Sequence, residues 1–471
     1  MNRRIFIKVI SPFFLLIFLL TKIVVLTGCA NMIPPSGGDR DSLPPHLVKV
    51  TPPDSSTGFS NKTITFTFDE YIDQPQDIFK DLLISPTPSI LPNVESKLRT
   101  LKVTIKDTLE PNTTYYYNFG DAIKDVNEGN VLHNFSYIFT TGTTLDTLQL
   151  SGKVLLAETG GIDSTLIVML HRSGEDSAVV KERARYITRL DGKGNFKFLY
   201  LPSGTYYLYA LKDENGLGRH SENSLFAFAD SAIEIKPNAG PITLYAFVEE
   251  KQSSSPISFT GGNRPGTKPD ERRLRFTSSG NMQDLLGDFY LNFDRPLRNL
   301  DTTKLQVSTD STFNPVSSRW EIDSLKKRLT LKTTWKESTL YNLILDKDFA
   351  EDSSGRKLLK TDTLNFTTRK QADYGSLKFS FTNIDLSKNP VLQVSQNGTV
   401  VKTFPLSAAE LYQPLFNPGE YDLSILYDEN KNGHWDPGKF FEGKKQPELV
   451  KPLNKKITVR SNWDNEFEIT L

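Results

Sequence analysis

Short stretches of alternating apolar and polar residues dominate the chain after residue 43. In residues 64–69 the apolar side chains stand at every second position, and residues 289–294 have the same spacing. A period of two places these side chains on one face of a β-strand. Asn, Asp, Gly and Pro, which favour turns, separate the stretches. Helical periodicity is almost absent, so the pattern predicts an all-β chain of tandem β-sandwich domains.

One set of predicted strands occurs twice in the same order. It begins with residues 64–69 and continues through 101–105, a Tyr-rich strand at 115–119, an Asp-led turn and a closing strand that ends on Phe-Thr-Thr. The second set has the same sequence of features at 289–294, 329–332, 340–345, 352–356 and 364–368. An internal repeat of this length indicates a duplicated domain.

These features resemble the bacterial S-layer-type Ig-like domain. The resemblance rests on Phe-Asp after a short strand, the Tyr-rich strand, an Asp-x-x-Gly turn and the closing Phe-Thr-Thr. It implies Ig-like sandwiches at residues 44–142 and, in diverged form, at 273–370. The segment at 37–45 also resembles the entry to that domain in lipoproteins of the Bacteroidota.

A second module is also present twice. Each copy has a Gly-x-Tyr strand start, at Gly204 and Gly419, followed at the same distance by Asp213 and Asp428. The pattern resembles the prealbumin-like sandwich of carboxypeptidase regulatory and starch-binding-like domains. The resemblance implies such sandwiches at residues 147–250 and 373–471. Residues 251–272 are rich in Ser, Gly and Pro and are predicted to be a linker between the first of these sandwiches and the second Ig-like copy.

The N-terminus has the layout of an export signal. Arg3, Arg4 and Lys8 precede an apolar run, and the segment closes on Leu-Thr-Gly-Cys29. Basic, apolar and then small residues are typical of a signal peptide, here residues 1–28. The closing four residues resemble a lipobox, which implies that Cys29 carries the lipid. The tract that follows is rich in Pro and Gly, so residues 29–43 are predicted to form a flexible tether.

The alternative is an uncleaved membrane anchor with an incidental cysteine. A spanning helix needs about 20 continuous apolar residues, and Lys22 interrupts this stretch. Ala30 after the cysteine favours the outer membrane by resemblance to known lipoproteins, because the inner-membrane retention signal is Asp. Whether the protein faces the periplasm or the cell surface stays open.

Charge and cysteine content exclude several classes of protein. The chain has 56 basic and 56 acidic residues, a formal net charge of zero, and no basic stripe, so we expect no nucleic-acid partner. The single cysteine excludes an intrachain disulfide framework. The five histidines are isolated, and the motifs of the common hydrolases and phosphate-binding loops are missing from the sequence. We expect no catalytic residues and no enzyme activity. The pair Asp69-Glu70 is interpreted as part of a turn.

The sequence offers one candidate metal site and no other cofactor. Asp428, Asn430, Asn432 and Asp436 place oxygen ligands around Gly433, as in a calcium loop. Lys439 stands where a bidentate Glu is needed, so the alternative is a solvated turn.

Two further sets of residues are candidates for surface chemistry. Exposed Tyr207, Tyr209 and Trp435 would stack on envelope glycans or contact another protein, the alternative being cross-strand packing. Asp followed by Ser or Thr resembles the O-glycosylation acceptor of exported Bacteroidota proteins, whereas the plain alternative is turn chemistry. The implied attachment points are Ser42, Thr108, Thr147, Ser164, Ser177, Ser231, Ser324 and Thr363.

These observations favour a non-enzymatic, lipid-anchored outer-membrane protein whose domains serve as a scaffold or adhesion module. Its partners would be the membrane, through the lipid, and envelope glycans or other outer-membrane proteins. One rival hypothesis is a glycan-binding or outer-membrane-complex accessory lipoprotein. A cryptic hydrolase is the other, and it predicts a deep pocket with convergent polar groups.

Overall fold

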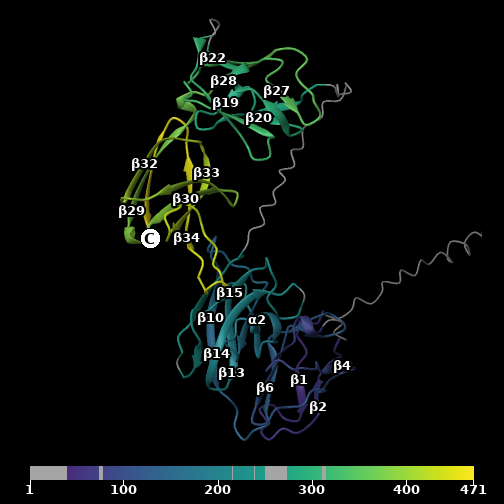
Figure 1. Ribbon diagram of the computed structural model, residues 1–471. Helices are drawn as coiled ribbons and strands as arrows, with labels where there is room; N and C mark the ends of the chain where they lie inside the picture. The colour runs from purple at the N-terminus through teal and green to yellow at the C-terminus, as the bar shows by residue number, and fades with distance from the viewer. Residues whose placement is uncertain (1–39, 74–77, 215, 238, 250–272, 310–313) are drawn as a thin grey trace, which may run out of the picture. The chain divides into compact units, whose positions relative to one another are not determined.

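The computed structural model describes residues 40–73, 78–214, 216–237, 239–249, 273–309 and 314–471. These residues form 35 β-strands and one short α-helix, which confirms the prediction of an all-β chain of tandem sandwiches (Figure 1). The single α-helix among the described residues is α2 (Ala178–Lys181), and the short 3₁₀ helices are η1 (Ile78–Lys80), η2 (Thr302–Lys304), η3 (Gln371–Asp373) and η4 (Leu386–Lys388). In the described chain, no helix has the length and apolar character needed to span a bilayer. Cys29 and the linker at 251–272 lie outside the described residues.

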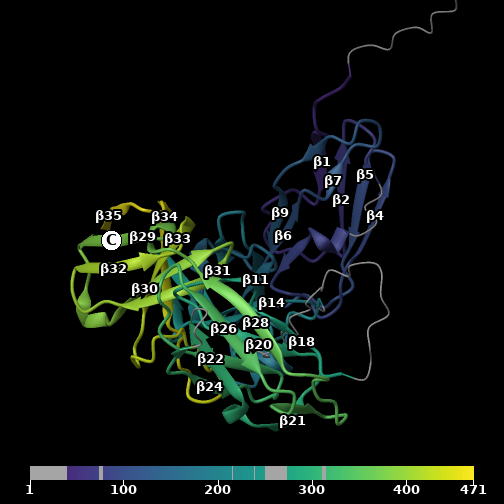
Figure 2. The same ribbon diagram turned by 90° about the horizontal axis from the view of Figure 1, so that it is seen from above.

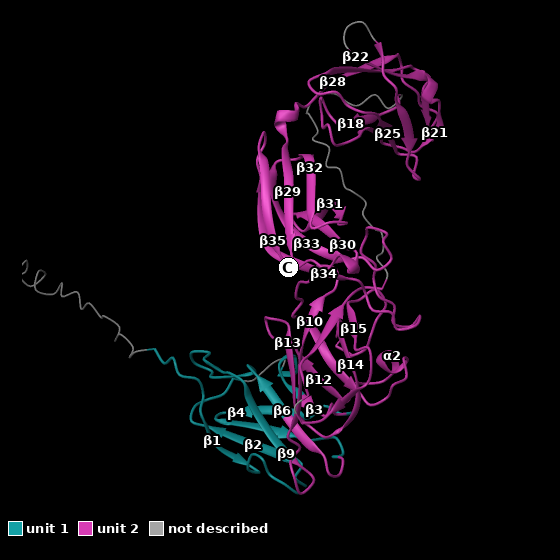
Figure 3. Ribbon diagram, turned by 90° about the vertical axis from the view of Figure 1, so that its left-hand side faces the viewer, with its two compact units in different colours: residues 1–83, 89–109, 117–139 teal, residues 84–88, 110–116, 140–471 magenta. Residues whose placement is uncertain are grey.

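The chain forms two compact units (Figure 3). Unit 1 contains the described parts of residues 1–83, 89–109 and 117–139, and unit 2 contains residues 84–88, 110–116 and the described parts of 140–471. Unit 1 therefore comprises most of the first Ig-like domain. Unit 2 contains the second Ig-like domain and two further β-sandwiches, which are called here the second and fourth sandwiches by their order in the chain.

A four-stranded sheet forms one layer of the first Ig-like domain (Figure 2). Its strands run in the order β1 (Leu47–Thr51), β2 (Thr63–Phe68), β5 (Thr100–Thr104) and β4 (Asn93–Lys97). Ile64, Phe66 and Phe68 are buried along β2 while the threonines between them are half-buried, which is the predicted alternation. The Phe66 ring packs edge-on against Phe119, with 5.5 Å between ring centroids. The other strands are β3 (Leu83–Ser85), β6 (Thr114–Gly120) and β9 (Phe135–Thr140) in one sheet, and the pair β7 (Ile123–Lys124) and β8 (Val131–Leu132).

The second Ig-like domain has two main sheets around one core. One sheet has the order β18 (Phe276–Ser278), β20 (Phe289–Phe293), β25 (Arg328–Lys332), β24 (Arg319–Ile322). The other has the order β19 (Met282–Gln283), β28 (Asp362–Thr368), β26 (Leu340–Leu345), β22 (Leu305–Thr309), β23 (Asn314–Pro315), and β21 (Leu297–Leu300) pairs with β27 (Ala350–Asp352). Phe289 stacks on Phe366 between the sheets at 4.3 Å. Apolar side chains from both inner faces thus close the core.

The two Ig-like copies share hydrogen bonds that follow from their shared sequence pattern. The Tyr115 hydroxyl accepts the backbone N–H of Glu110 at 2.8 Å, and the Tyr341 hydroxyl accepts that of Lys336 at 3.0 Å. The final threonine of each Phe-Thr-Thr accepts a backbone N–H close to these bonds, from Thr113 in the first copy and from Thr339 in the second. The repeated tyrosines and threonines therefore fix the same loop in each copy.

The second and fourth sandwiches have the same topology. Three strands form one sheet in each, with the middle strand antiparallel to one neighbour and parallel to the other. In the second sandwich the order is β13 (Asn195–Leu201), β10 (Leu148–Leu156), β17 (Ile242–Ala246), and in the fourth it is β32 (Glu410–Phe416), β29 (Gly375–Thr382), β35 (Asp464–Thr470). This agreement in pairing supports the interpretation of a duplicated module.

The second sheet of each of these sandwiches differs at one edge. Three strands correspond in order. In the second sandwich they are β12 (Tyr186–Arg189), β11 (Leu166–His171) and β14 (Gly204–Lys212), and in the fourth they are β31 (Thr399–Pro405), β30 (Pro390–Gln396) and β33 (Gly419–Tyr427). In the second sandwich β14 pairs with two short strands, β15 (Phe226–Phe228) and β16 (Ile233–Ile235). In the fourth, β33 pairs along its length with the single long strand β34 (Leu449–Val459). A long loop at residues 428–448 connects β33 to β34, and it is called the docking loop below.

Candidate functional site

The docking loop extends from the fourth sandwich to the outer face of β14 and β15 in the second. Phe440 is only 1% exposed, and its ring lies 5.7 Å from Tyr209 and 5.1 Å from both Phe226 and Phe228. A buried aromatic side chain removes a large apolar area from water, and edge-on ring pairs add to that stabilisation. Phe440 is therefore the apolar anchor between the two sandwiches.

Polar contacts surround this anchor. The Phe440 N–H donates to Glu249 Oε1 at 2.6 Å, and the Gln446 amide donates to the Phe228 carbonyl at 3.0 Å. Lys444 Nζ lies 2.7 Å from Asp176 Oδ1. An apolar centre ringed by polar pairs is the usual anatomy of a specific interface.

Two glycines allow the backbones of the two sandwiches to approach closely. A Cβ on Gly438 would lie 2.7 Å from the Phe247 ring, and a Cβ on Gly160 would lie 2.2 Å from Pro452 Cδ. The N–H of Val450 also donates to the carbonyl of Ala157 at 2.9 Å. The interface is thus tightly packed on both sides of the docking loop.

The exposure predicted for the aromatic residues is partly wrong. Tyr209 is 3% exposed and contacts Phe440, because the docking loop covers the outer face of β14. Tyr207 is half-buried over Gly174, and Trp435 is half-buried with its indole N–H donating to the Glu448 carbonyl at 2.7 Å. Tyr209 is therefore an internal contact of this chain. Ligand contact by Tyr207 and Trp435 stays a prediction.

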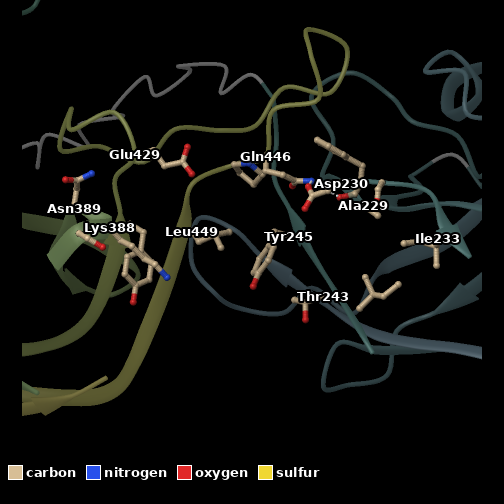
Figure 4. A pocket seen from close by; sticks show the side chains of 16 residues that line it. Ala229, Asp230, Ile233, Thr243, Tyr245, Lys388, Asn389, Glu429, Gln446 and Leu449 are labelled. Atoms are coloured by element: carbon tan, nitrogen blue, oxygen red, sulfur yellow. Dashed lines mark hydrogen bonds between the residues drawn. The ribbon is translucent and has the colours of Figure 1, made fainter. Parts of the chain in front are cut away.

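A pocket of about 830 Å³ lies beside this interface (Figure 4). Side chains from both sandwiches line it, including Asp230, Tyr245, Lys388, Tyr427, Glu429 and Gln446. Gln446 donates to Asp230 at 2.6 Å, and Lys388 Nζ lies 5.9 Å from the centre of the Tyr427 ring. Tyrosine rings next to carboxylates, amides and an amine can bind a polar ligand that also has apolar faces. None of the residues selected from the sequence as ligand contacts lines this pocket.

The predicted calcium loop is held by hydrogen bonds within the protein. The Asp428 carboxylate accepts backbone N–H groups of Lys431, Asn432 and Gly433, and Asp436 accepts the side-chain amides of Asn430 and Asn432. Among the described residues, no group of three or more His, Cys, Asp or Glu side chains is arranged to hold a metal ion. Calcium binding stays a prediction, and the solvated-turn alternative explains these hydrogen bonds.

Glu448 is a member of this loop that the sequence pattern did not reveal. It is 2% exposed, and its carboxylate accepts the N–H groups of Glu429 at 2.9 Å and Asp436 at 3.0 Å. Burial, and the nearby charges of Asp428 and Asp436, raise the pKa of Glu448. Glu448 stands at the end of the docking loop and accepts hydrogen bonds from residues near its start, so it holds the two ends of the loop together.

The candidate acid–base residues do not converge on a shared site within the described chain. Asp69 accepts the N–H of His46 at 2.8 Å, as expected for a turn residue. His133 pairs with Asp121 at an exposed position, and His220 lies against Phe226. His171 is 1% exposed next to Tyr209, and its Nε2 atom is buried without a hydrogen-bond partner among the described residues.

The burial of His171 predicts a pH-dependent stability of the second sandwich. Burial lowers the pKa of His171 to about 4, below the ordinary value of 6.5. The unfolded chain therefore takes up a proton that the folded chain does not, and the free energy of unfolding falls as the pH falls from about 6.5 to about 4. We expect His171→Gln to flatten the dependence of Tm on pH in this range relative to the native chain. Equal pH profiles for His171→Gln and the native chain would contradict the assignment.

All eight residues proposed for O-glycosylation are exposed. They are Ser42, Thr108, Thr147, Ser164, Ser177, Ser231, Ser324 and Thr363. An attached sugar needs a surface position, so the fold leaves room for the modification at each of them. Their glycosylation stays a prediction.

The match to a known family concerns the first domain. Residues 41–141 match the bacterial Ig-like domain family. The match lies close to the predicted Ig-like domain at 44–142 and covers less than half of the chain. No curated protein matches the sequence.

Several solved structures are similar to parts of the chain. The N-terminal part of the bacterial S-layer protein SbsC has 17% identity over 41% of this chain and 44% of its own length, with a TM-score of 0.16. The major pilin subunit BcpA of Bacillus cereus has 10% identity over 68% of this chain and 99% of its own, with a TM-score of 0.17. The LD-transpeptidase LdtMt1 has 14% identity over 40% of this chain and 76% of its own, with a TM-score of 0.18. The chain spans less than half of the SbsC fragment, and none of these likenesses bears on function.

Proposed function

We propose that this chain is an exported cell-envelope protein that is anchored by a lipid on Cys29 and acts as a structural and interaction module without enzymatic activity. The proposal is supported by the order of features along the chain: a lipobox-like segment, a short tether and a domain that matches the bacterial Ig-like family from residue 41. The outer membrane of a member of the Bacteroidota is the proposed location, because Ala30 replaces the inner-membrane retention signal.

The observation that carries the structural role is the buried joint made by Phe440. Two sandwiches separated in sequence by a complete Ig-like domain are packed together through the docking loop and the start of β34. Such a joint stabilises a fixed arrangement of surfaces, which suits a scaffold. Edge strands and end loops of sandwiches then offer positions for partners.

The lipid anchor is tested by comparing Cys29→Ser with the control Asn31→Ser in cells. We expect the native chain and Asn31→Ser to enter the detergent phase and to carry an acyl label, because two or more chains give stable membrane attachment. Cys29→Ser should stay in the aqueous phase without label. Equal partitioning of all three proteins would contradict the anchor.

A second candidate function is the binding of an envelope glycan in the pocket beside the docking loop. Tyr245 and Tyr427 offer ring faces, and Asp230, Glu429 and Gln446 offer hydrogen bonds to hydroxyl groups. We expect Tyr427→Ala to reduce binding to a glycan array at least tenfold, while the exposed control Tyr412→Ala, on β32, retains it. An array without a signal, or a signal equal in both variants, would argue against this function and leave the scaffold role as the better account.

A further inference from the structure

A cluster of four arginines gathers at one end of the second Ig-like domain. Arg273, Arg275, Arg295 and Arg356 line a small pocket of about 180 Å³, together with Asp294 and Asp352. Four guanidinium groups against two carboxylates leave a formal excess of two positive charges in one concave site. The chain as a whole has no net charge, so this excess is local.

Three segments of backbone bring the arginines together. Arg273 and Arg275 flank Leu274, which is buried and whose N–H donates to the Lys357 carbonyl at 2.9 Å. Residues two apart in an extended chain face the same side, so the two arginines point away from the core together. Asp294 and Arg295 follow β20, and their segment is joined to the first by the Asp294 N–H, which donates to the Arg275 carbonyl at 3.3 Å.

The third segment is the turn after β27 (Figure 1). Asp352 accepts the N–H groups of Ser354 at 2.8 Å and Arg356 at 2.9 Å. These backbone hydrogen bonds fix the Asp352 carboxylate in its own turn. Its negative charge is already included in the formal excess of two positive charges in the pocket. Arg295 donates to the Ser354 hydroxyl at 2.6 Å, which holds its guanidinium over the same turn.

Three of the four guanidinium groups in the pocket are available to a ligand. Across the described part of the chain, the side chains of Arg273, Arg275 and Arg356 have no hydrogen bond or ion pair. Like charges repel when they share a small cavity, and bringing several of them together without partners costs free energy. Arginine stays charged at all physiological pH values, and its planar fork matches the oxygens of phosphate and sulfate groups.

The first Ig-like domain shows that the fold itself does not require these arginines. The Asp69 N–H donates to the His46 carbonyl, as the Asp294 N–H does to that of Arg275, so His46 and Arg275 occupy equivalent positions. Glu70 stands at the position of Arg295, and Asp125 accepts three backbone N–H groups in the turn equivalent to that of Asp352. The same end of the fold is acidic in the first copy and basic in the second.

We infer that the arginine cluster of the second Ig-like domain is a binding site for a compact oxyanion, a phosphate or sulfate group carried by a larger envelope molecule. The pocket holds a single such group and not a whole polymer. The rest of the ligand extends into solvent past Arg273 and Arg295, the two exposed members of the cluster. This inference does not depend on the lipid anchor or on the pocket beside the docking loop.

Calorimetric titration of the purified full chain tests the inference, with inorganic phosphate and sulfate as probes at constant ionic strength. We expect saturable binding, at least tenfold weaker in the double variant Arg275→Gln, Arg356→Gln and unchanged in Arg319→Gln, an exposed arginine of the same domain that pairs with Glu321. The single variant Arg273→Gln, at an exposed position, should also weaken binding and guards against misfolding of the double variant. No saturable binding, or equal binding in all variants, would overturn the inference.

Two further arms separate the sources of the oxyanion. Glucose 1-phosphate represents a phosphorylated glycan, and phosphatidylcholine vesicles with and without phosphatidic acid represent a lipid headgroup. Arginine-dependent binding to either probe supports the site and names its source. If the native chain binds neither glucose 1-phosphate nor the vesicles with phosphatidic acid, the inference is wrong.

Discussion

Replacing Phe440 by alanine is expected to separate the fourth sandwich from the second while each sandwich stays folded. The side chain is 1% exposed and its ring packs on Tyr209, Phe226 and Phe228. Removing a buried phenylalanine typically costs about 3–5 kcal/mol, and here the loss falls on the joint between domains. No strand of either sandwich runs through Phe440, so the two sheets of each should persist.

This expectation is checked by limited proteolysis of the docking loop and by the radius of gyration in solution. Faster cleavage and a larger radius are the predicted results for Phe440→Ala, with an unchanged β-sheet circular dichroism spectrum. Tyr412→Ala is the control, because this aromatic side chain of the fourth sandwich is 62% exposed and lies on β32, outside the docking loop. Equal protease resistance and equal radius for the two variants would show that Phe440 does not anchor the joint.

Gly152→Ala is expected to have the largest effect on the stability of a single sandwich. A Cβ at this position in β10 would lie 2.0 Å from the Ile242 carbonyl oxygen and 2.5 Å from the Phe196 ring. Overpacking a core commonly costs about 1–3 kcal/mol. A clash with a backbone oxygen of the adjacent parallel strand β17 cannot be relieved by rotating a side chain, so we expect a cost at or above the top of that range.

The measurement is the free energy of unfolding in urea, followed by the fluorescence of the aromatic residues. Gly192→Ala is the control within the same sandwich, because nothing lies within 4 Å of a Cβ there. A stability loss confined to Gly152→Ala supports the register of β10 with β17. If both variants were as stable as the native chain, the parallel pairing of these strands would be wrong.

Local sequence patterns predicted the strands and the duplication well. The alternation in residues 64–69 specifies which side chains of β2 are buried, since a shift of one residue would expose all of them. The Tyr-rich strand and the closing Phe-Thr-Thr recur because Tyr115 and Tyr341, with their threonine partners, hold the same loop in both Ig-like copies. These features depend on neighbours within one domain.

The features between domains could not be predicted in this way. Phe440 and Glu249 are hydrogen-bonded although far apart along the chain, and no periodicity relates two such positions. The alternation along β14 places Tyr209 on the face of the strand that points away from the core of its own sandwich, so the sequence predicts exposure. The side chain is buried because the docking loop of another domain covers that face. The pocket has the same origin, because its lining comes from separate segments of two sandwiches.

The position of Glu448 shows a different limit of the sequence pattern. The calcium-loop template looks for a carboxylate at its twelfth position, where the chain has Lys439. The structure places the carboxylate of Glu448 beside the loop from the far end of the docking loop instead. A template of fixed spacing cannot include a residue that a long connection returns to the same place.

The central claim is that the docking loop of the fourth sandwich is seated on the second sandwich in the native protein. Zero-length carbodiimide cross-linking followed by mass spectrometry tests it most directly, since Lys444 Nζ and Asp176 Oδ1 lie 2.7 Å apart. We predict a cross-linked peptide that joins Asp176 to Lys444 in the native chain and that is strongly reduced in Phe440→Ala. Recovery of short-range pairs such as Lys357 with Asp348, without the Asp176–Lys444 product in the native chain, would contradict the claim.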